Sequence, residues 1–124
     1  MKKTLEITKA LADRNRLRII LMLSCNEELC VCQIADVLNI TMPSVSRHMS
    51  KLSVARLIES RKEGRWIYYR LSEEFPYDLL DWLEENLSDS NEIQNDRRVL
   101  EKVLSKKSMD FCKNNSNIRR KCNE

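Results

Sequence analysis

The apolar residues of this chain recur at helical spacing along most of its length, and one short segment, residues 58–71, departs from that period. Two β-prone runs in this segment stand on either side of Glu63-Gly64, which is the pattern of a β-hairpin. Gly64 is the only glycine of the chain and there are two prolines, so little room is left for further turns. We therefore predict a mainly α fold that carries one β-hairpin.

Four helical patterns precede the hairpin. Residues 4–12 form the first, and Asp13 can cap the second, which covers about residues 14–24 and is apolar nearly all round. We expect this second helix to be the centre of the core. A short third pattern and a fourth are separated by a turn at residues 39–41, and Thr41 can cap the fourth. A short helix, a tight turn and a second helix make a helix-turn-helix pattern.

Residues 41–70 have the composition of a surface that binds a polyanion. They carry seven Lys or Arg and two Glu, whereas residues 71–106 carry four basic and ten acidic residues. Small hydroxyls and hydrogen-bond donors on the fourth helix suit contact with phosphates and base edges in a major groove. A basic hairpin directly behind a helix-turn-helix is the wing of a winged-helix domain, which can reach phosphates or a minor groove. The predicted contacts with double-stranded DNA are Ser44, Ser46, Arg47, His48, Lys51, Arg61, Lys62 and Arg65.

Two further amphipathic patterns follow the hairpin, at about residues 79–87 and 93–104, on an acidic background. These two patterns contain more apolar residues than a compact winged helix can bury. The surplus favours a homodimer, which would have two recognition helices. Residues 107–124 are polar and contain two cysteines, which is typical of a flexible tail. We predict a winged-helix DNA-binding and dimerisation domain over residues 1–106 and a cysteine-containing tail over residues 107–124.

The sequence favours a cytoplasmic protein without a membrane segment. No apolar run approaches the ~20 residues that a bilayer-spanning helix needs, and the N-terminal residues lack the apolar core of a signal peptide. Five cysteines, an odd number, do not make the disulfide framework of a secreted protein. In a reducing compartment they are core residues, metal ligands or redox thiols.

Two of the cysteines, Cys30 and Cys32, stand one residue apart at the expected start of the short third helix. On a regular helix their side chains would point about 200° apart, because each residue advances the helix by about 100°. They can share a metal only where the backbone can bend, and the first turn of a helix has few intrahelical bonds to lose. Soft sulfur ligands suit As(III), Sb(III) or Cu(I), whereas two thiols and one histidine are too few for a closed zinc site.

Four segments resemble, in order and spacing, the ArsR/SmtB family of metal-responsive repressors. They are residues 11–19, 28–32, 46–49 and 64–71, and the match extends over about residues 5–75. The Glu-Leu-Cys-Val-Cys segment at residues 28–32 is similar to that of the arsenic- and antimony-responsive branch. The resemblance implies a dimeric winged-helix repressor of a metalloid-resistance operon. Such a repressor leaves its operator when As(III) or Sb(III) binds cysteine thiolates, and it needs no organic cofactor.

The sequence departs from that branch at Ala35, where its best-known members have a third cysteine. Arsenite prefers three thiolates, so the third ligand is open. Cys112 or Cys122 of the tail could supply it, as could Cys25, a small thiol or water. We favour a tail cysteine, because Cys25 follows a core helix and is expected to be held by packing.

Two other functions were weighed against this one. A repressor switched by thiol oxidation, or by Cu(I), would keep the DNA-binding surface and use the same cysteine pair differently. An enzyme, such as a thiol oxidoreductase or an arsenate reductase, is disfavoured, because the chain lacks an anion-binding loop and is helical where such enzymes have a βαβ frame. We therefore predict a regulator and not an enzyme.

Overall fold

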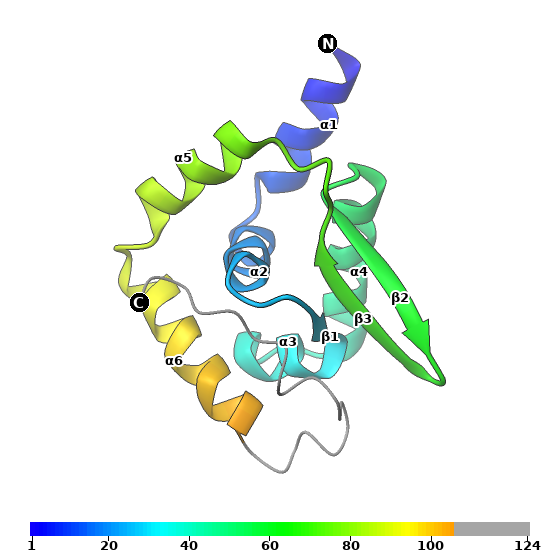
Figure 1. The fold of residues 1–124 in the computed structure, drawn as a ribbon, viewed down its shortest axis with the longest axis vertical. Coiled ribbons are helices and arrows are strands. Elements are labelled where there is room, and N and C mark those ends of the chain that lie inside the picture. Colours follow the sequence, from blue (N-terminus) through cyan, green and yellow to red (C-terminus); the bar gives the residue numbers. More distant parts are fainter. Residues whose placement is uncertain (106–124) are drawn as a thin grey trace.

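The computed structural model describes residues 1–105, which form a helical fold with a small antiparallel sheet (Figure 1). Its elements, in chain order, are α1 (Lys2–Leu11), α2 (Arg14–Ser24), β1 (Leu29–Cys30), α3 (Val31–Leu38), α4 (Met42–Val54), β2 (Ile58–Glu63), β3 (Trp66–Leu71), α5 (Tyr77–Leu87) and α6 (Asn91–Ser105). The predicted mainly α winged helix-turn-helix is confirmed. The predicted tail over residues 107–124 lies outside the described residues, so the domain boundary stays a prediction. None of the described helices is both long and apolar enough to cross a membrane.

The predicted caps begin the helices of the helix-turn-helix region. Asp13 Oδ1 accepts a hydrogen bond from the backbone N–H of Arg16 at 3.1 Å, which starts α2. Thr41 Oγ1 accepts one from the backbone N–H of Ser44 at 3.2 Å, which starts α4. Asn39 ends α3 in the left-handed conformation, with a φ of 59°. These local signals fix the lengths of α2 and α3 and the tight turn before α4.

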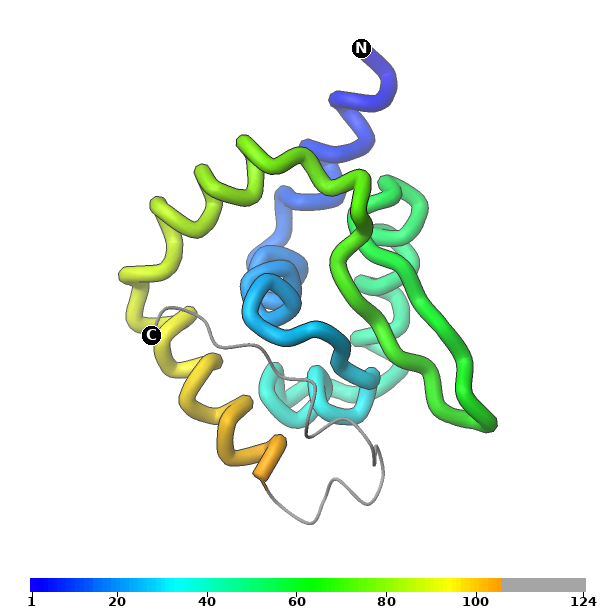
Figure 2. Tube along the Cα trace, in the orientation of Figure 1, coloured from blue at the N-terminus to red at the C-terminus, as the bar shows by residue number. Residues whose placement is uncertain are grey.

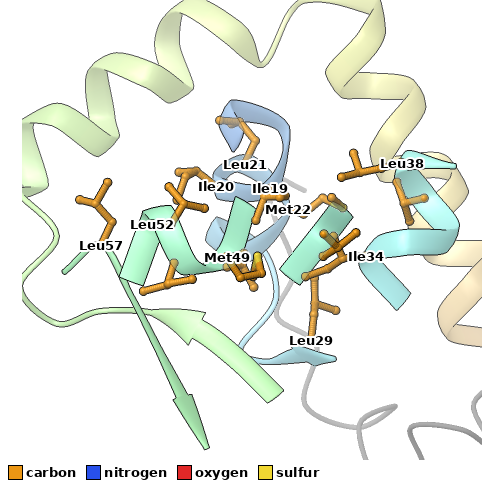
Figure 3. Close-up of a cluster of buried hydrophobic side chains, with 14 of the residues drawn as sticks. Ile19, Ile20, Leu21, Met22, Leu29, Ile34, Leu38, Met49, Leu52 and Leu57 are labelled. Atoms are coloured by element: carbon orange, nitrogen blue, oxygen red, sulfur yellow. The ribbon is translucent and has the colours of Figure 1, made fainter. Parts of the chain in front are cut away.

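The core forms around α2, which lies in the middle of the fold with the other elements around it (Figure 1). Figure 3 shows side chains from α2, α3, α4 and β1 meeting in one cluster, and those labelled include Ile19, Met22, Ile34 and Met49. These four are completely or almost completely buried, and burial of each such side chain stabilises the fold by about 1.5–3 kcal/mol. Because α4 packs directly on this core, its opposite face is held in a fixed orientation.

The hairpin is a wing whose turn reaches out past the helices (Figure 2). β2 and β3 pair from Ile58 opposite Leu71 to Glu63 opposite Trp66, which leaves a two-residue turn. We expected the turn at Glu63-Gly64, but Glu63 still belongs to β2 and the turn is one residue further on. The reason is Gly64, whose φ of 64° suits the first central position of a two-residue hairpin turn.

The sheet has a third strand, β1, that the sequence did not predict. The strand order is β1-β3-β2, and β1 pairs with β3 through Leu29 opposite Tyr69 and Cys30 opposite Tyr68. Two residues are too few to show a strand period, and the partner strand is about forty residues away in the sequence. The consequence is functional, because β1 attaches the cysteine segment to the wing.

Candidate metal centre and nucleic-acid interface

The sulfur atoms of Cys30 and Cys32 converge at the start of α3. Cys30 is the N-cap residue, with an extended backbone (φ −97°, ψ 163°), and Cys32 is the second residue of the helix. Their Sγ atoms lie 2.7 Å apart. Because Cys30 lies outside the helical geometry, the divergence expected on a regular helix does not apply. Two sulfur atoms so close together can be ligands of one atom.

Gln33 holds the backbone of Cys30 in this position. Its side-chain Oε1 accepts a hydrogen bond from the backbone N–H of Cys30 at 3.0 Å, and the side chain is buried. The three-residue spacing from the N-cap is that of a capping box, in which Cys30 takes the place of the usual serine or threonine. This spacing was visible in the sequence and was missed. A helix N-terminus also favours an anion, which suits a thiolate ligand.

The described residues supply two thiols at this position and no third ligand. No three Cys, His, Asp or Glu side chains within residues 1–105 come together in a group that could hold a metal ion. Cys25 is buried at the C-terminal end of α2, 3.7 Å from Ser24 Oγ, and is not part of such a group. Cys112 and Cys122 lie outside the described residues.

The predicted DNA contacts on α4, with the exception of Ser46, share one face of the helix, and Ser46 lies about 100° around the axis from Arg47. Arg47 and Lys51 are exposed, as is Ser46, and Arg47 Nη2 donates to Ser44 Oγ at 3.2 Å. His48 is half-buried, and its Nδ1 lies 3.3 Å from Arg16 Nη1, which holds the ring against the start of α2. This face can present a short row of hydrogen-bond donors to a nucleic-acid groove. The core packs on the opposite side of α4 and fixes the orientation of the helix.

The predicted DNA contacts on the wing differ in the surroundings of their side chains. Lys62 and Arg65 are exposed at or beside the turn. Arg61 is turned back toward β1, where it donates to both carboxylate oxygens of Glu28 at 2.6 and 2.9 Å. Arg61 also donates to Glu63 at 2.8 Å and lies over the ring of Tyr68, 4.7 Å from its centroid. The hydrogen bonds that Arg61 donates to Glu28 and then to Glu63 raise the pKa of its guanidinium above the ordinary value.

Comparison with known proteins identifies relatives of this chain. Residues 13–60 match the family described as bacterial regulatory protein, arsR family. The chain is 33% identical over 105 residues to the arsenic resistance transcriptional regulator ArsR2 of Pseudomonas putida, and the match covers 85% of this chain and 87% of that protein. It is 43% identical over 72 residues to the arsenical resistance operon repressor of Escherichia coli, covering 58% of this chain and 62% of that repressor. The chain thus spans less than two thirds of the E. coli protein.

A solved structure shows the same fold. The homodimeric winged helix-turn-helix DNA-binding domain Mb0332 of Mycobacterium bovis, described as a possible ArsR-family transcriptional regulator, superposes with a TM-score of 0.61 at 26% identity. The superposition covers 73% of this chain and 82% of that chain.

Proposed function

Because this chain belongs to the ArsR family of bacterial regulatory proteins, we propose that it releases its operator when As(III) or Sb(III) binds the thiolates of Cys30 and Cys32. Membership of the family makes it a DNA-binding transcriptional repressor and not an enzyme, which confirms the predicted class. The observation that carries the proposal is the convergence of the two sulfur atoms, 2.7 Å apart, at the start of the first helix of the helix-turn-helix.

The inducer is proposed from ligand chemistry and from the names of the relatives. Two converging thiolates are soft ligands, which suit a trivalent metalloid. Two of the relatives are named for arsenic or arsenical resistance, which supports control of a metalloid-resistance operon. We propose Cys112 or Cys122 as the third ligand, with a small thiol or water as the other sources. Cys25 is less favoured, since the described residues do not group it with the pair.

The position of the pair suggests how ligation reaches the DNA-binding surface. Cys30 begins α3, and α3 packs against α4, which carries the exposed Arg47 and Lys51. A metalloid that pulls the two sulfur atoms into its own geometry changes the first turn of α3 and so the tilt of α4. Binding of the metalloid weakens DNA binding only if the metalloid prefers the conformation that does not fit the operator.

A homodimer would present two recognition helices to a palindromic operator. α6 buries its apolar stripe against α2 and α3, so the unburied apolar surface lies elsewhere. Part of it lies on α5, where Tyr77 and Trp82 are 81% and 58% exposed, and part on α1, where Leu5 is exposed. We propose that α1 and α5 contribute to the contact between protomers, in agreement with the homodimeric state named for the M. bovis domain.

The proposed function is tested by fluorescence anisotropy of the protein on its own upstream promoter DNA, titrated with arsenite under reducing conditions at fixed salt. We expect release at about one arsenite per protomer, with affinity lowered about 5- to 150-fold, the usual range of such coupling. If arsenite has no effect while an oxidant or Cu(I) releases the DNA, the inducer proposal is wrong. The same pair would then act as a redox switch or a Cu(I) site.

Substitution of Arg47 tests the recognition face of α4. We expect Arg47→Ala to weaken operator binding about 5- to 150-fold, which corresponds to the ~1–3 kcal/mol of a good base contact. Arg98→Ala is the matched control. Arg98 is also an exposed arginine that bonds a side chain three residues earlier, Asn95 at 3.4 Å, but it lies on α6. Equal operator affinities for the two variants, measured by anisotropy, would remove Arg47 from the interface.

A further inference from the structure

One row of residues crosses the sheet from the cysteine pair to the wing. Cys30 of β1 pairs with Tyr68 of β3, and Tyr68 pairs with Arg61 of β2. Side chains of directly opposed residues project from the same face of a sheet. Accordingly Tyr68, which is 1% exposed, packs against Cys30 with Cys32 beside it, while Arg61 lies over its ring. The thiols and a predicted DNA contact are therefore joined through one buried ring.

The ion pair between Glu28 and Arg61 is a second contact between the cysteine segment and the wing. Glu28 stands two residues before Cys30, and its side chain is only 11% exposed. Both of its carboxylate oxygens accept from Arg61, one from Nε and one from Nη2. A shielded carboxylate depends on its cation, because an unpaired charge is poorly tolerated away from water. Glu28 and Arg61 therefore hold the cysteine segment and the wing to each other.

Arg61 cannot keep its contacts with Glu28 and also bind a phosphate through the same pair of donors. Each of its three guanidinium nitrogens donates to a carboxylate, Nε and Nη2 to Glu28 and Nη1 to Glu63, so three of its five N–H groups are used. A phosphate bound through Nε and Nη2 would replace Glu28, because guanidinium recognises carboxylate and phosphate through the same planar geometry. The guanidinium is thus shared between two alternatives, one inside the protein and one in the operator.

We propose that Glu28 and Arg61 form a latch that carries inducer binding to the wing. In the operator complex Arg61 leaves Glu28 and binds a phosphate, and ligation of Cys30 and Cys32 stabilises the latched arrangement and withdraws Arg61 from DNA. This inference rests on the proposed function and adds a path to it, since the wing responds as well as α4. By linkage, DNA that captures Arg61 weakens inducer binding by the same factor.

The latch is tested with Glu28→Gln, which keeps the shape of the side chain and removes its charge. Glu59→Gln is the matched control, because Glu59 pairs with Arg70 at 2.8 Å on the same sheet but has no link to β1. Both variants lose one negative charge on the sheet, so a difference between them does not come from net charge. Operator affinity is measured by anisotropy over a series of salt concentrations, with and without saturating arsenite. Arsenite binding is followed separately by the ultraviolet absorbance of its thiolate complex.

We expect Glu28→Gln to bind arsenite with the parent stoichiometry and to bind the operator more tightly. With saturating arsenite, the slope of log affinity against log salt should be steeper for Glu28→Gln than for the parent by about 0.9 for each protomer, the value for the one phosphate contact that the parent loses when Arg61 is withdrawn. The factor by which arsenite weakens operator binding should fall several-fold, and Glu59→Gln should match the parent in all of these. In an Arg61→Gln background, Glu28→Gln should have no further effect on that factor.

Two results separate the latch from the proposed function. If the parent protein releases DNA with arsenite and Glu28→Gln shows the parent slope and the parent release factor, the latch is wrong and the inducer proposal stands. If the parent itself does not respond to arsenite, the inducer proposal fails first. The operator affinity of Glu28→Gln without arsenite still tests whether Glu28 competes with DNA for Arg61, and an unchanged affinity overturns the latch in that case too.

Discussion

Substitution of Cys30 by serine is expected to give a protein that binds its operator and ignores arsenite. The variant Cys30→Ser should remain folded, because serine is a preferred N-cap residue and completes a standard capping box with Gln33. It should lose the response, because a hydroxyl is a poor ligand for a soft metalloid. The release factor, about 5- to 150-fold in the parent, should fall to about one when measured by anisotropy with arsenite.

Cys25→Ser is the control for this experiment. Cys25 is also a buried cysteine, at the end of α2, and it is not grouped with the pair in the described part of the chain. We expect this variant to release DNA with arsenite as the parent does. A Cys30→Ser protein that responds like the parent would place the inducer site elsewhere. A Cys25→Ser protein that loses the response while binding the operator normally would make Cys25 the third ligand.

The helices and the wing could be predicted because their signals are local. Asp13 and Thr41 cap helices in the structure as the sequence suggested, and the change of period after Leu57 marks the hairpin. The cysteine pair is a predicted metal site on the grounds of its spacing and of the family resemblance. The sequence also places it at the first turn of a helix, where the backbone can bend, and the structure brings the two sulfur atoms together there. Propensities, caps and periods act over a few residues, so a sequence shows them directly.

The contacts that connect the site to the wing could not be predicted in this way. Arg61 is a predicted DNA contact from its charge and position, whereas nothing in the sequence indicates its contact with Glu28, which is 33 residues away. β1 is too short to have a period, so nothing local showed that Cys30 would pair with Tyr68. Long-range pairings depend on how the elements pack, and charge clustering alone does not tell a cation held by a carboxylate from one that is available to DNA.

Asp96 on α6 is a further residue whose role the sequence concealed. It stands among the acidic residues that follow the hairpin, yet it is 2% exposed. Its spacing from Ile93 and Leu100 places it on the apolar stripe of α6, which was the available signal. Arg18 of α2 donates to both of its carboxylate oxygens at 2.9 Å, and these hydrogen bonds raise the pKa of the Arg18 guanidinium. The pair therefore fixes α6 on the central helix.

Removal of the Asp96 carboxylate is expected to be strongly destabilising. Asp96→Ala leaves Arg18, whose side chain is largely buried, with Glu92 at 3.7 Å as its remaining carboxylate partner. Loss of one member of a buried pair lowers the free energy of unfolding by about 3–5 kcal/mol. The midpoint of urea unfolding, followed by circular dichroism at fixed protomer concentration, should fall by about 1 M or more. Glu92→Ala removes a more exposed carboxylate from the same arginine and should change stability by about 1 kcal/mol or less. Similar midpoints for the two variants would show that the buried Arg18–Asp96 pair contributes no more to stability than the more exposed Arg18–Glu92 pair. In that case α6 is held on α2 by its apolar stripe.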